Sequence, residues 1–408
     1  MKILYLAHRF PYPPSKGEKI RTFNQIQQLA SKHTIHLCSF VDDSGEVAQT
    51  INLKEYCASV DVVRRNSVAT IVLGPAAILR NKPLSVQLFY RKAFAELVRR
   101  KLATERFDCI IVSCSSMAQY VASSSAIPKI IDFIDVDSEK WRLYARHHAF
   151  PLSFIYCREA NRLAVYEENI AALFDHSILC SAQEAETLRK RTKERPVSVV
   201  ANGVDLKYFS PCLRSAQPNE PTVVFTGAMD YFPNIDAAQF FCREIFPAVR
   251  TELPSTQFYI VGRNPTRQVK QLGEQTNVFV TGTVPDVRSY LAQATVSVAP
   301  LRLARGVQNK VLEAMAMGVP VVGTTEAFKG IAATEQDGIR IAHDPLCFAQ
   351  HVISFLQGDG TLRRQAGMQA RRYVECVHRW GDQGATLERL IEEVVRKHRR
   401  KGEVEVKR

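Results

Sequence analysis

The feature that most constrains this chain is a regular alternation of short apolar runs with longer helical patterns. The runs are continuous and rich in Val and Ile, which is typical of parallel strands that are covered on both faces. They form two series, with strands expected at 3–7, 34–40, 109–113, 129–132, 176–180 and 197–201, and then at 222–226, 257–261, 278–281, 296–300, 319–323 and 339–342. Because strands alternate with helices, we expect two doubly wound α/β domains with parallel sheets, facing one another across a cleft.

A polar stretch between the two series, KYFSPCLRSAQPNEP, contains three prolines and is typical of a linker. The sequence therefore predicts an N-terminal domain at 1–208, a linker at 209–220 and a C-terminal domain at 221–378. The last residues, 379–408, have a charged amphipathic pattern centred on 387–395. We expect them to form a helix that packs back on the N-terminal domain.

Composition excludes several classes of protein. The 408 residues are 46% hydrophobic and 23% charged, as in ordinary globular proteins. No apolar run approaches the roughly 20 residues of a membrane span, and the start lacks the pattern of a signal peptide, so we expect a cytoplasmic protein. None of the ten cysteines forms a C-x-x-C pair, which favours reduced structural thiols over a metal site.

The stretch RGVQNKVLEAMAMGVPVVGT, residues 305–324, places Lys310 and Glu313 in an otherwise apolar run. A helix from about 307–309 to 317 would end at Gly318 in a left-handed cap, with Pro320 preventing its continuation. Lys310 then lies in the first turn, where the helix dipole disfavours a cation unless an anion such as phosphate is bound. A surface pair between Lys310 and Glu313 is the plainer alternative. Glu313 would accept hydroxyl hydrogen bonds from a ribose, so the two charges fit a nucleotide sugar.

Several motifs carry a resemblance to a known family. LEAMAMGVPVV resembles the signature of the family 4 retaining glycosyltransferases, which have the GT-B fold of two Rossmann-like domains. FTGAM at 225–229, YIVGRNP at 259–265, VFVTGTVPDVRSYLAQATVSVAP at 278–300, ANGVDLKYF at 201–209 and the segment RFPYPPSKGEKIRTFNQIQQLA are similar to other parts of that family. FPYPPSKGEKIR, DFIDVDSEKW and GVQNKVLEAMAMG further resemble the sugar transferases that accompany PEP-CTERM/exosortase exopolysaccharide systems.

The resemblance implies roles for the matching positions. Glu313 would bind the ribose, and Lys310 with nearby amides of the segment that includes Gly306 and Asn309 would bind the diphosphate. Gly17 would let the first N-terminal loop approach the diphosphate. Gly282 and Val284 would border the base, while Arg263 follows a strand end on the donor side.

Two departures from the family pattern concern the donor. The family places a Glu eight residues before Glu313, where this chain has Arg305, and an Arg after the first C-terminal strand, where it has Ala228. Arg305 or Arg263 would then supply the missing phosphate-binding cation. Alternatively, Arg305 would bind a carboxylate on the transferred sugar.

Asp135-Val136-Asp137 resembles the metal-binding D-x-D of a different glycosyltransferase fold. GT-B enzymes usually act without metal, so we expect neither a metal nor another cofactor beside the nucleoside diphosphate sugar. We expect Asp135 near the acceptor hydroxyl or the donor sugar. Together with the donor-binding Lys310 and Glu313, Asp135 is a candidate catalytic residue.

The expected activity is transfer of a sugar to a hydroxyl of a glycan or a lipid-linked acceptor, as in exopolysaccharide synthesis. A nucleotide-sugar epimerase of the same fold and a basic nucleic-acid-binding protein are the alternatives. The latter is disfavoured despite the net charge of +13, because no zinc-finger spacing or RNP-like sequence occurs.

The basic charge also predicts peripheral association with an anionic membrane. Residues 80–106 carry eight Lys or Arg. Within this segment Arg99, Arg100 and Lys101 accompany Phe94 and the pair at 97–98, apolar residues that would face either the core or a lipid surface.

Overall fold

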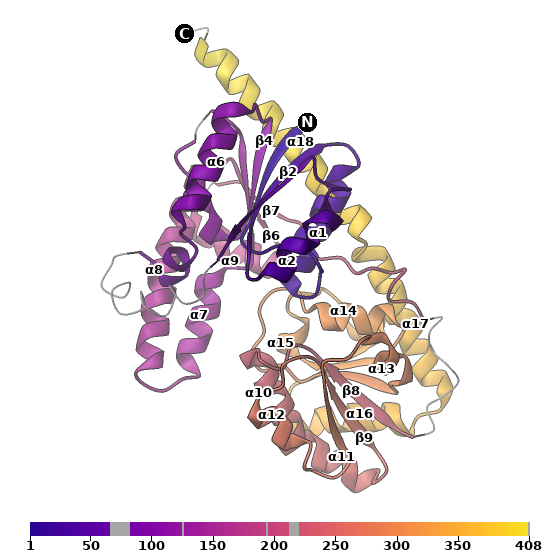
Figure 1. The fold of residues 1–408 in the computed structure, drawn as a ribbon. Coiled ribbons are helices and arrows are strands. Elements are labelled where there is room, and N and C mark those ends of the chain that lie inside the picture. The colour runs from indigo at the N-terminus through magenta and orange to yellow at the C-terminus, as the bar shows by residue number, and fades with distance from the viewer. Residues whose placement is uncertain (66–81, 125, 193–194, 212–219, 407–408) are drawn as a thin grey trace. The chain divides into compact units, whose positions relative to one another are not determined.

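The computed structural model describes all of the chain except residues 66–81, 125, 193–194, 212–219 and 407–408 (Figure 1). It divides into two compact units, one of residues 1–201 with 380–408 and the other of residues 202–379. Neighbouring strands pair in parallel throughout both described sheets. The doubly wound α/β class expected from the sequence is confirmed for each unit.

The first unit is a seven-stranded sheet in the order β3-β2-β1-β4-β5-β6-β7, with helices on its faces. Its elements are β1 (Lys2–Ala7), α1 (Gly17–Ala30), β2 (Thr34–Val41), α2 (Ser44–Ala48), η1 (Gln49–Leu53), β3 (Ser59–Arg64), α5 (Leu84–Leu88), α6 (Lys92–Thr104), β4 (Cys109–Ser113), η2 (Ser115–Tyr120), β5 (Lys129–Ile134), α7 (Asp137–Arg146), α8 (Leu152–Leu173), β6 (His176–Leu179), α9 (Ala182–Thr192), β7 (Val197–Val199) and α18 (Trp380–Val406).

The second unit is a six-stranded sheet in the order β10-β9-β8-β11-β12-β13. Its elements are β8 (Thr222–Thr226), α10 (Phe232–Phe240), the π-helical η4 (Phe241–Ile245), α11 (Phe246–Glu252), β9 (Gln257–Val261), α12 (Arg267–Leu272), β10 (Val278–Gly282), α13 (Arg288–Gln293), β11 (Val296–Ala299), α14 (Asn309–Ala316), β12 (Val321–Thr324), α15 (Thr325–Phe328), η5 (Glu335–Asp337), β13 (Ile339–Ala342), α16 (Pro345–Gln357) and α17 (Gly360–Val377).

The C-terminal helix α18 belongs to the first unit, where it runs beside α1 (Figure 1). Its apolar face, including Leu387, Ile391 and Val394, joins the core on the same side of the sheet as Ile26 and Leu29 of α1. Burial of this face explains why a helix so rich in charge is held in place, because each buried Leu or Ile contributes about 1.5–3 kcal/mol.

The boundary between the units lies at 201/202, earlier than the expected end of the N-terminal domain at 208. Residues 202–208 belong to the second unit because the amide of Val204 donates to the carbonyl of His378 at 2.8 Å. The His378 ring in turn lies 2.7 Å from the Asn202 carbonyl. Most of the expected linker falls on 212–219, outside the described residues.

The end of α14 is as the sequence predicts. Gly318 has a φ of +66°, so it occupies the left-handed region in which glycine is favoured. The amide of Val319 donates to the Ala314 carbonyl at 3.0 Å and that of Gly318 to the Met315 carbonyl at 2.9 Å. These bonds cap the helix. They also explain why β12 begins at Val321 and not at the expected residue 319.

Candidate functional site

The order of the strands in the second unit identifies one position along the carboxyl ends of its strands where a ligand is expected. β8 is first in the chain of this unit, with β9 on one side and β11 on the other. Chain connections therefore leave in opposite directions at the junction of β8 and β11. In open α/β sheets, ligands bind beyond the carboxyl ends of the strands at such a switch point. The loops after β8 and β11 are thus the first place to look for a site.

Lys310 of α14 and Asn234 of α10 meet at this position. The Lys310 ammonium donates a hydrogen bond to Asn234 Oδ1 and lies 4.8 Å from the centre of the Phe225 ring. Asn234 Nδ2 donates to the Ala228 carbonyl at 2.9 Å, which fixes the orientation of the amide. These contacts hold the Lys310 side chain at the carboxyl ends of the strands. In the alternative considered from the sequence, Lys310 would instead form a surface ion pair with Glu313.

The loops after β8 and β9 touch through glycine backbones. A Cβ on Gly262 would lie 1.6 Å from the Gly227 carbonyl oxygen, so no side chain fits there. A Cβ on Gly227 would lie 2.7 Å from Asn234 Nδ2 and 3.3 Å from Lys310 Nζ. The amide of Met229 bonds the Arg263 carbonyl at 2.9 Å. Arg263 therefore follows β9 directly beside the loop that joins β8 to α10.

Burial shifts both charged groups of α14 toward neutrality. It lowers the pKa of Lys310 to about 7, opposed by the nearby Glu313 carboxylate. It raises the pKa of Glu313 to about 7, opposed in turn by Lys310. Two groups with such shifts at a switch point mark a candidate site, because a bound anion would restore the charge on the lysine.

The segment between β11 and the first turn of α14 contains the other candidate donor-binding residues. Gly306 is buried and has a φ of +62°. The Arg305 carbonyl accepts from Gln308 Nε2 at 2.9 Å, and Asn309 Oδ1 accepts from Asn202 Nδ2 at 3.0 Å. Gln308, the N-cap residue, makes no side-chain cap hydrogen bond to the helix amides. The first turn of α14 thus presents Lys310 together with amide donors.

Gly282 and Val284 lie at the far end of this sheet edge. Gly282 ends β10, has a φ of +69°, and has open space where a Cβ would be. Val284 packs against the core. Since β10 is separated from β11 by β9 and β8, these residues are on the order of 14 Å from the Lys310 strand end.

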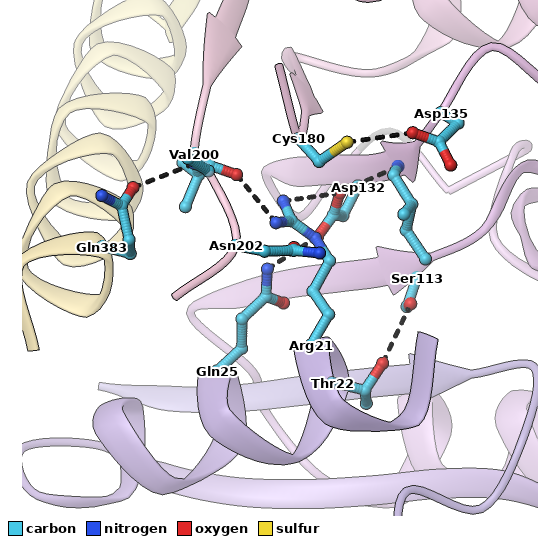
Figure 2. Close-up of polar contacts among 12 residues, drawn as sticks. Arg21, Thr22, Gln25, Ser113, Asp132, Asp135, Cys180, Val200, Asn202 and Gln383 are labelled. Atoms are coloured by element: carbon cyan, nitrogen blue, oxygen red, sulfur yellow. Dashed lines mark hydrogen bonds and ion pairs between the residues drawn. The ribbon is translucent and has the colours of Figure 1, made fainter. Parts of the chain in front are cut away.

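The first unit holds the remaining two candidates, with Gly17 at the start of α1 and Asp135 just after β5. Figure 2 shows the buried network that joins these elements. Arg21 of α1 donates from Nε to Asp132 Oδ2 at 2.7 Å and from Nη1 to the Val200 carbonyl at 2.7 Å. Asp132 also accepts from Gln25 at 2.7 Å. The pair fixes α1 against the end of β5.

Asp132 also shapes the turn that carries Asp135. Its Oδ1 accepts from the amide of Ile134 at 3.0 Å, and Ile134 has a φ of +68°, which is strained for a β-branched residue. Beyond this turn, Cys180 donates from Sγ to Asp135 Oδ1 at 2.9 Å (Figure 2). Burial, together with the charge of Glu184, raises the pKa of Asp135 to about 6.

Asp137, the other carboxylate of the D-x-D sequence, pairs with Lys140 on its own helix. The N-cap residue of α7 is Val136, which makes no side-chain cap hydrogen bond. Amides at this helix start instead donate to two other carboxylates, the Ser138 amide to Glu167 at 3.0 Å and the Val136 amide to Glu184 at 2.8 Å. Asp135 and Asp137 thus have separate partners.

Helix α6 does not present an apolar face to a lipid surface. Phe94, Leu97 and Val98 are all buried in the core. Lys101 is buried too, with its ammonium 2.7 Å from Asp61 Oδ2. Of the two locations that the sequence left open for these apolar residues, the structure shows the core. No helix in the described part of the chain has the length and hydropathy of a membrane span.

Sequence reasoning did not identify two residues that contact the candidate groups. Asn234, the partner of Lys310, follows Pro233 at the start of α10, and nothing in the sequence alone distinguishes it from other helix-start residues. Cys180, the partner of Asp135, ends the expected strand at 176–180, and its spacing does not distinguish it from the other structural thiols. Only the pairing of β5 with β6 brings it beside Asp135.

Comparisons with known proteins place this geometry in context. Residues 220–358 match the model of the family described as glycosyl transferases group 1. A curated 44.6 kDa protein in the cps region of Klebsiella pneumoniae is 20% identical over 373 residues, which cover 87% of this chain and 90% of that protein.

Solved structures share the fold over nearly the whole chain. Sucrose-phosphate synthase from Thermosynechococcus elongatus has a TM-score of 0.71 at 17% identity, covering 97% of this chain and 99% of its own. Anabaena HepE in complex with UDP and glucose has a TM-score of 0.66 at 14% identity, covering 96% and 99%. The chain therefore has the GT-B fold, and residues 220–358 of its second unit are similar to the glycosyl transferases group 1 family.

Proposed function

We propose that this protein is a retaining, family 4 glycosyltransferase. It would move a sugar from a nucleoside diphosphate sugar to a hydroxyl of a glycan or lipid-linked acceptor, in exopolysaccharide synthesis of the PEP-CTERM type. One observation carries the proposal: Lys310, on the first turn of α14, is held by Asn234 at the switch point of the domain that matches group 1 glycosyl transferases. The HepE complexes with UDP and with UDP-glucose support a nucleotide-sugar donor. The cps-region relative supports a role in polysaccharide synthesis.

In this proposal the donor lies along the carboxyl edge of the second sheet. The base lies near Gly282 and Val284, and the diphosphate lies on the first turn of α14 and on Lys310. The separation of β10 from β11, on the order of 14 Å, leaves room for the ribose between them. Glu313 accepts hydrogen bonds from the ribose hydroxyls. These hydrogen bonds become stronger when the Glu313 carboxylate is ionised.

The chemical step requires the leaving diphosphate to gain negative charge as the glycosidic bond breaks. Preorganised donors stabilise such charge without reorganising, and the ammonium of Lys310 and the amides of α14 are of this kind. Arg263 or Arg305 would add the cation that is absent at Ala228. We propose that these groups neutralise the leaving group without a divalent ion, and that Asp135 contacts the acceptor hydroxyl or the transferred sugar.

The test is an incubation with a panel of nucleoside diphosphate sugars, with and without glycan acceptors, in the presence and absence of a chelator. The proposal predicts acceptor-dependent release of nucleoside diphosphate that survives the chelator and falls in Asp135→Asn. NMR of the product should show the anomeric configuration of the donor. An epimerase would instead convert the donor sugar with no acceptor present, and that result would overturn the proposal.

A further inference from the structure

Helices α7 and α8 form a hairpin whose tip extends away from the sheet of the first unit (Figure 1). Aromatic rings hold the two helices together near that tip. The Tyr156 ring centre lies 5.3 Å from that of Trp141, 6.2 Å from that of Tyr144 and 5.1 Å from that of His148. The hairpin therefore has its own small core.

Three large apolar side chains at the tip lie outside this core. Phe150 is 81% exposed, Leu152 45% and Phe154 63%. Single exposed apolar residues are common on protein surfaces. Three of them within five residues of one turn form a patch, and exposed apolar patches often mark an interaction site. Because the ring cluster around Tyr156 already holds the hairpin closed, the patch is not needed for folding.

The charge around the patch has one sign. Residues 140–158 contain Lys140, Arg142, Arg146 and Arg158, and no Asp or Glu. Lys140 pairs with Asp137 and Arg142 with Glu139 at the base of the hairpin. Nearer the tip, Arg146 at the end of α7 is exposed, so a cation lies beside the aromatic side chains.

We propose that the α7–α8 tip docks on an anionic lipid surface, with Phe150, Leu152 and Phe154 in the interfacial layer. Aromatic and aliphatic side chains beside cations are the combination that such a surface binds. A second copy of the chain is a poorer occupant, because a stable interface buries about 1,200–2,000 Å², more than three side chains supply. This surface replaces the one on α6, whose apolar residues face the core.

Docking at this tip has a geometric consequence for the first unit. α7 begins two residues after Asp135 and is 10 residues long, so the tip lies about 15 Å along the helix from that carboxylate. A membrane-bound tip would keep the Asp135 edge of the sheet close to the bilayer, where a lipid-linked substrate is found. The inference does not depend on the proposed transfer, because lipid binding is measured without turnover.

The test is co-sedimentation of the full chain with vesicles of phosphatidylcholine, alone or mixed with phosphatidylglycerol, at low and high salt. The variant replaces Phe150, Leu152 and Phe154 with Ser. A control replaces Leu346 and Met368 of the second unit, which are 68% and 67% exposed, with Ser. The wild type and the control should sediment with the anionic vesicles and be released by salt. The tip variant should bind at least about tenfold more weakly at an unchanged melting temperature.

Three results would overturn the inference. The first is a wild-type protein that stays in the supernatant with anionic vesicles at low salt, and the second is a tip variant that sediments as the wild type does. The third is a wild type that dimerises in analytical ultracentrifugation through the tip without binding vesicles, which would make the patch a self-association surface.

Discussion

The Lys310 ammonium donates a hydrogen bond to Asn234 Oδ1, and this contact joins the helices that follow β11 and β8. The two helices leave the sheet on opposite sides of its switch point. A neutral amide thus accepts from a lysine whose pKa is lowered by burial to about 7. The proposed diphosphate would supply the negative charge that the amide lacks.

Replacing Lys310 with Ala should weaken the binding of nucleoside diphosphates far more than the binding of nucleosides. Loss of one charge-assisted hydrogen bond to phosphate costs about 1.5–3 kcal/mol of binding free energy, and a nucleoside has no phosphate that could make this bond. Calorimetry with both ligands measures the difference. Lys329→Ala is the control, because Lys329, at the C-cap of α15, forms an exposed ion pair with Glu326. Equal losses for the two ligands would exclude the phosphate role.

Replacing Glu313 with Gln should reduce affinity for nucleotides while the fold is kept, because one acceptor oxygen becomes a donor amide. Titration with ribose and 2′-deoxyribose forms of the same nucleotide isolates the contact. The wild type should prefer the ribose form, and the variant should lose that preference. A variant that discriminates as the wild type does would show that Glu313 does not bind the ribose.

Diphosphate binding should take up a proton near neutral pH. Burial lowers the pKa of Lys310 to about 7, so the free protein loses the ammonium as pH rises above 7, while a bound anion favours it. Affinity for the diphosphate should then fall by up to about tenfold per pH unit above 7. Calorimetry in buffers of different ionisation enthalpy counts the protons.

Glu313 supplies the control for this proton count. Its pKa is raised to about 7, and hydrogen bonds from a ribose favour the carboxylate, so a nucleoside alone should release protons. Uptake that is equal for nucleoside and nucleoside diphosphate, or unchanged in Lys310→Met, would show that Lys310 is not the group that titrates.

Replacing Arg21 with Met should destabilise the first unit by about 3–5 kcal/mol, because Asp132 would remain buried without its partner. Chemical denaturation measures this loss. Lys397→Met is the control, since its pair with Glu393 is exposed, and it should change the free energy of unfolding by less than about 1 kcal/mol. A small effect of Arg21→Met would mean that the network in Figure 2 does not hold α1 on β5.

The sequence predicted the strands of both sheets well, because parallel strands that are buried on both faces leave continuous Val and Ile runs. It missed β3, whose sequence SVDVVR is only half-buried at the sheet edge and so lacks such a run. The observed limits of a strand differ from the expected ones where a local hydrogen bond determines them. Val319, for example, belongs to the cap of α14 and not to β12.

The candidate site was predictable where it lies on one segment and not where it depends on pairing. Lys310 and Glu313 were found because charges stand out in an apolar helix. Asn234 and Cys180 were not, since each becomes significant only when the sheet brings another loop beside it. The apolar face of α6 could not be assigned from its periodicity, because the same pattern suits a core and a lipid surface.

Thermal unfolding in the presence of a panel of nucleoside diphosphate sugars tests the central claim most directly. A ligand that binds only the folded state stabilises it by about 2.7 kcal/mol at a hundred times its Kd. We expect at least one member of the panel to raise the melting temperature of the wild type, and Lys310→Ala to remove most of that rise. If no member raises the melting temperature at millimolar concentration, or if Lys310→Ala shows the same rise as the wild type, the proposed donor site is wrong.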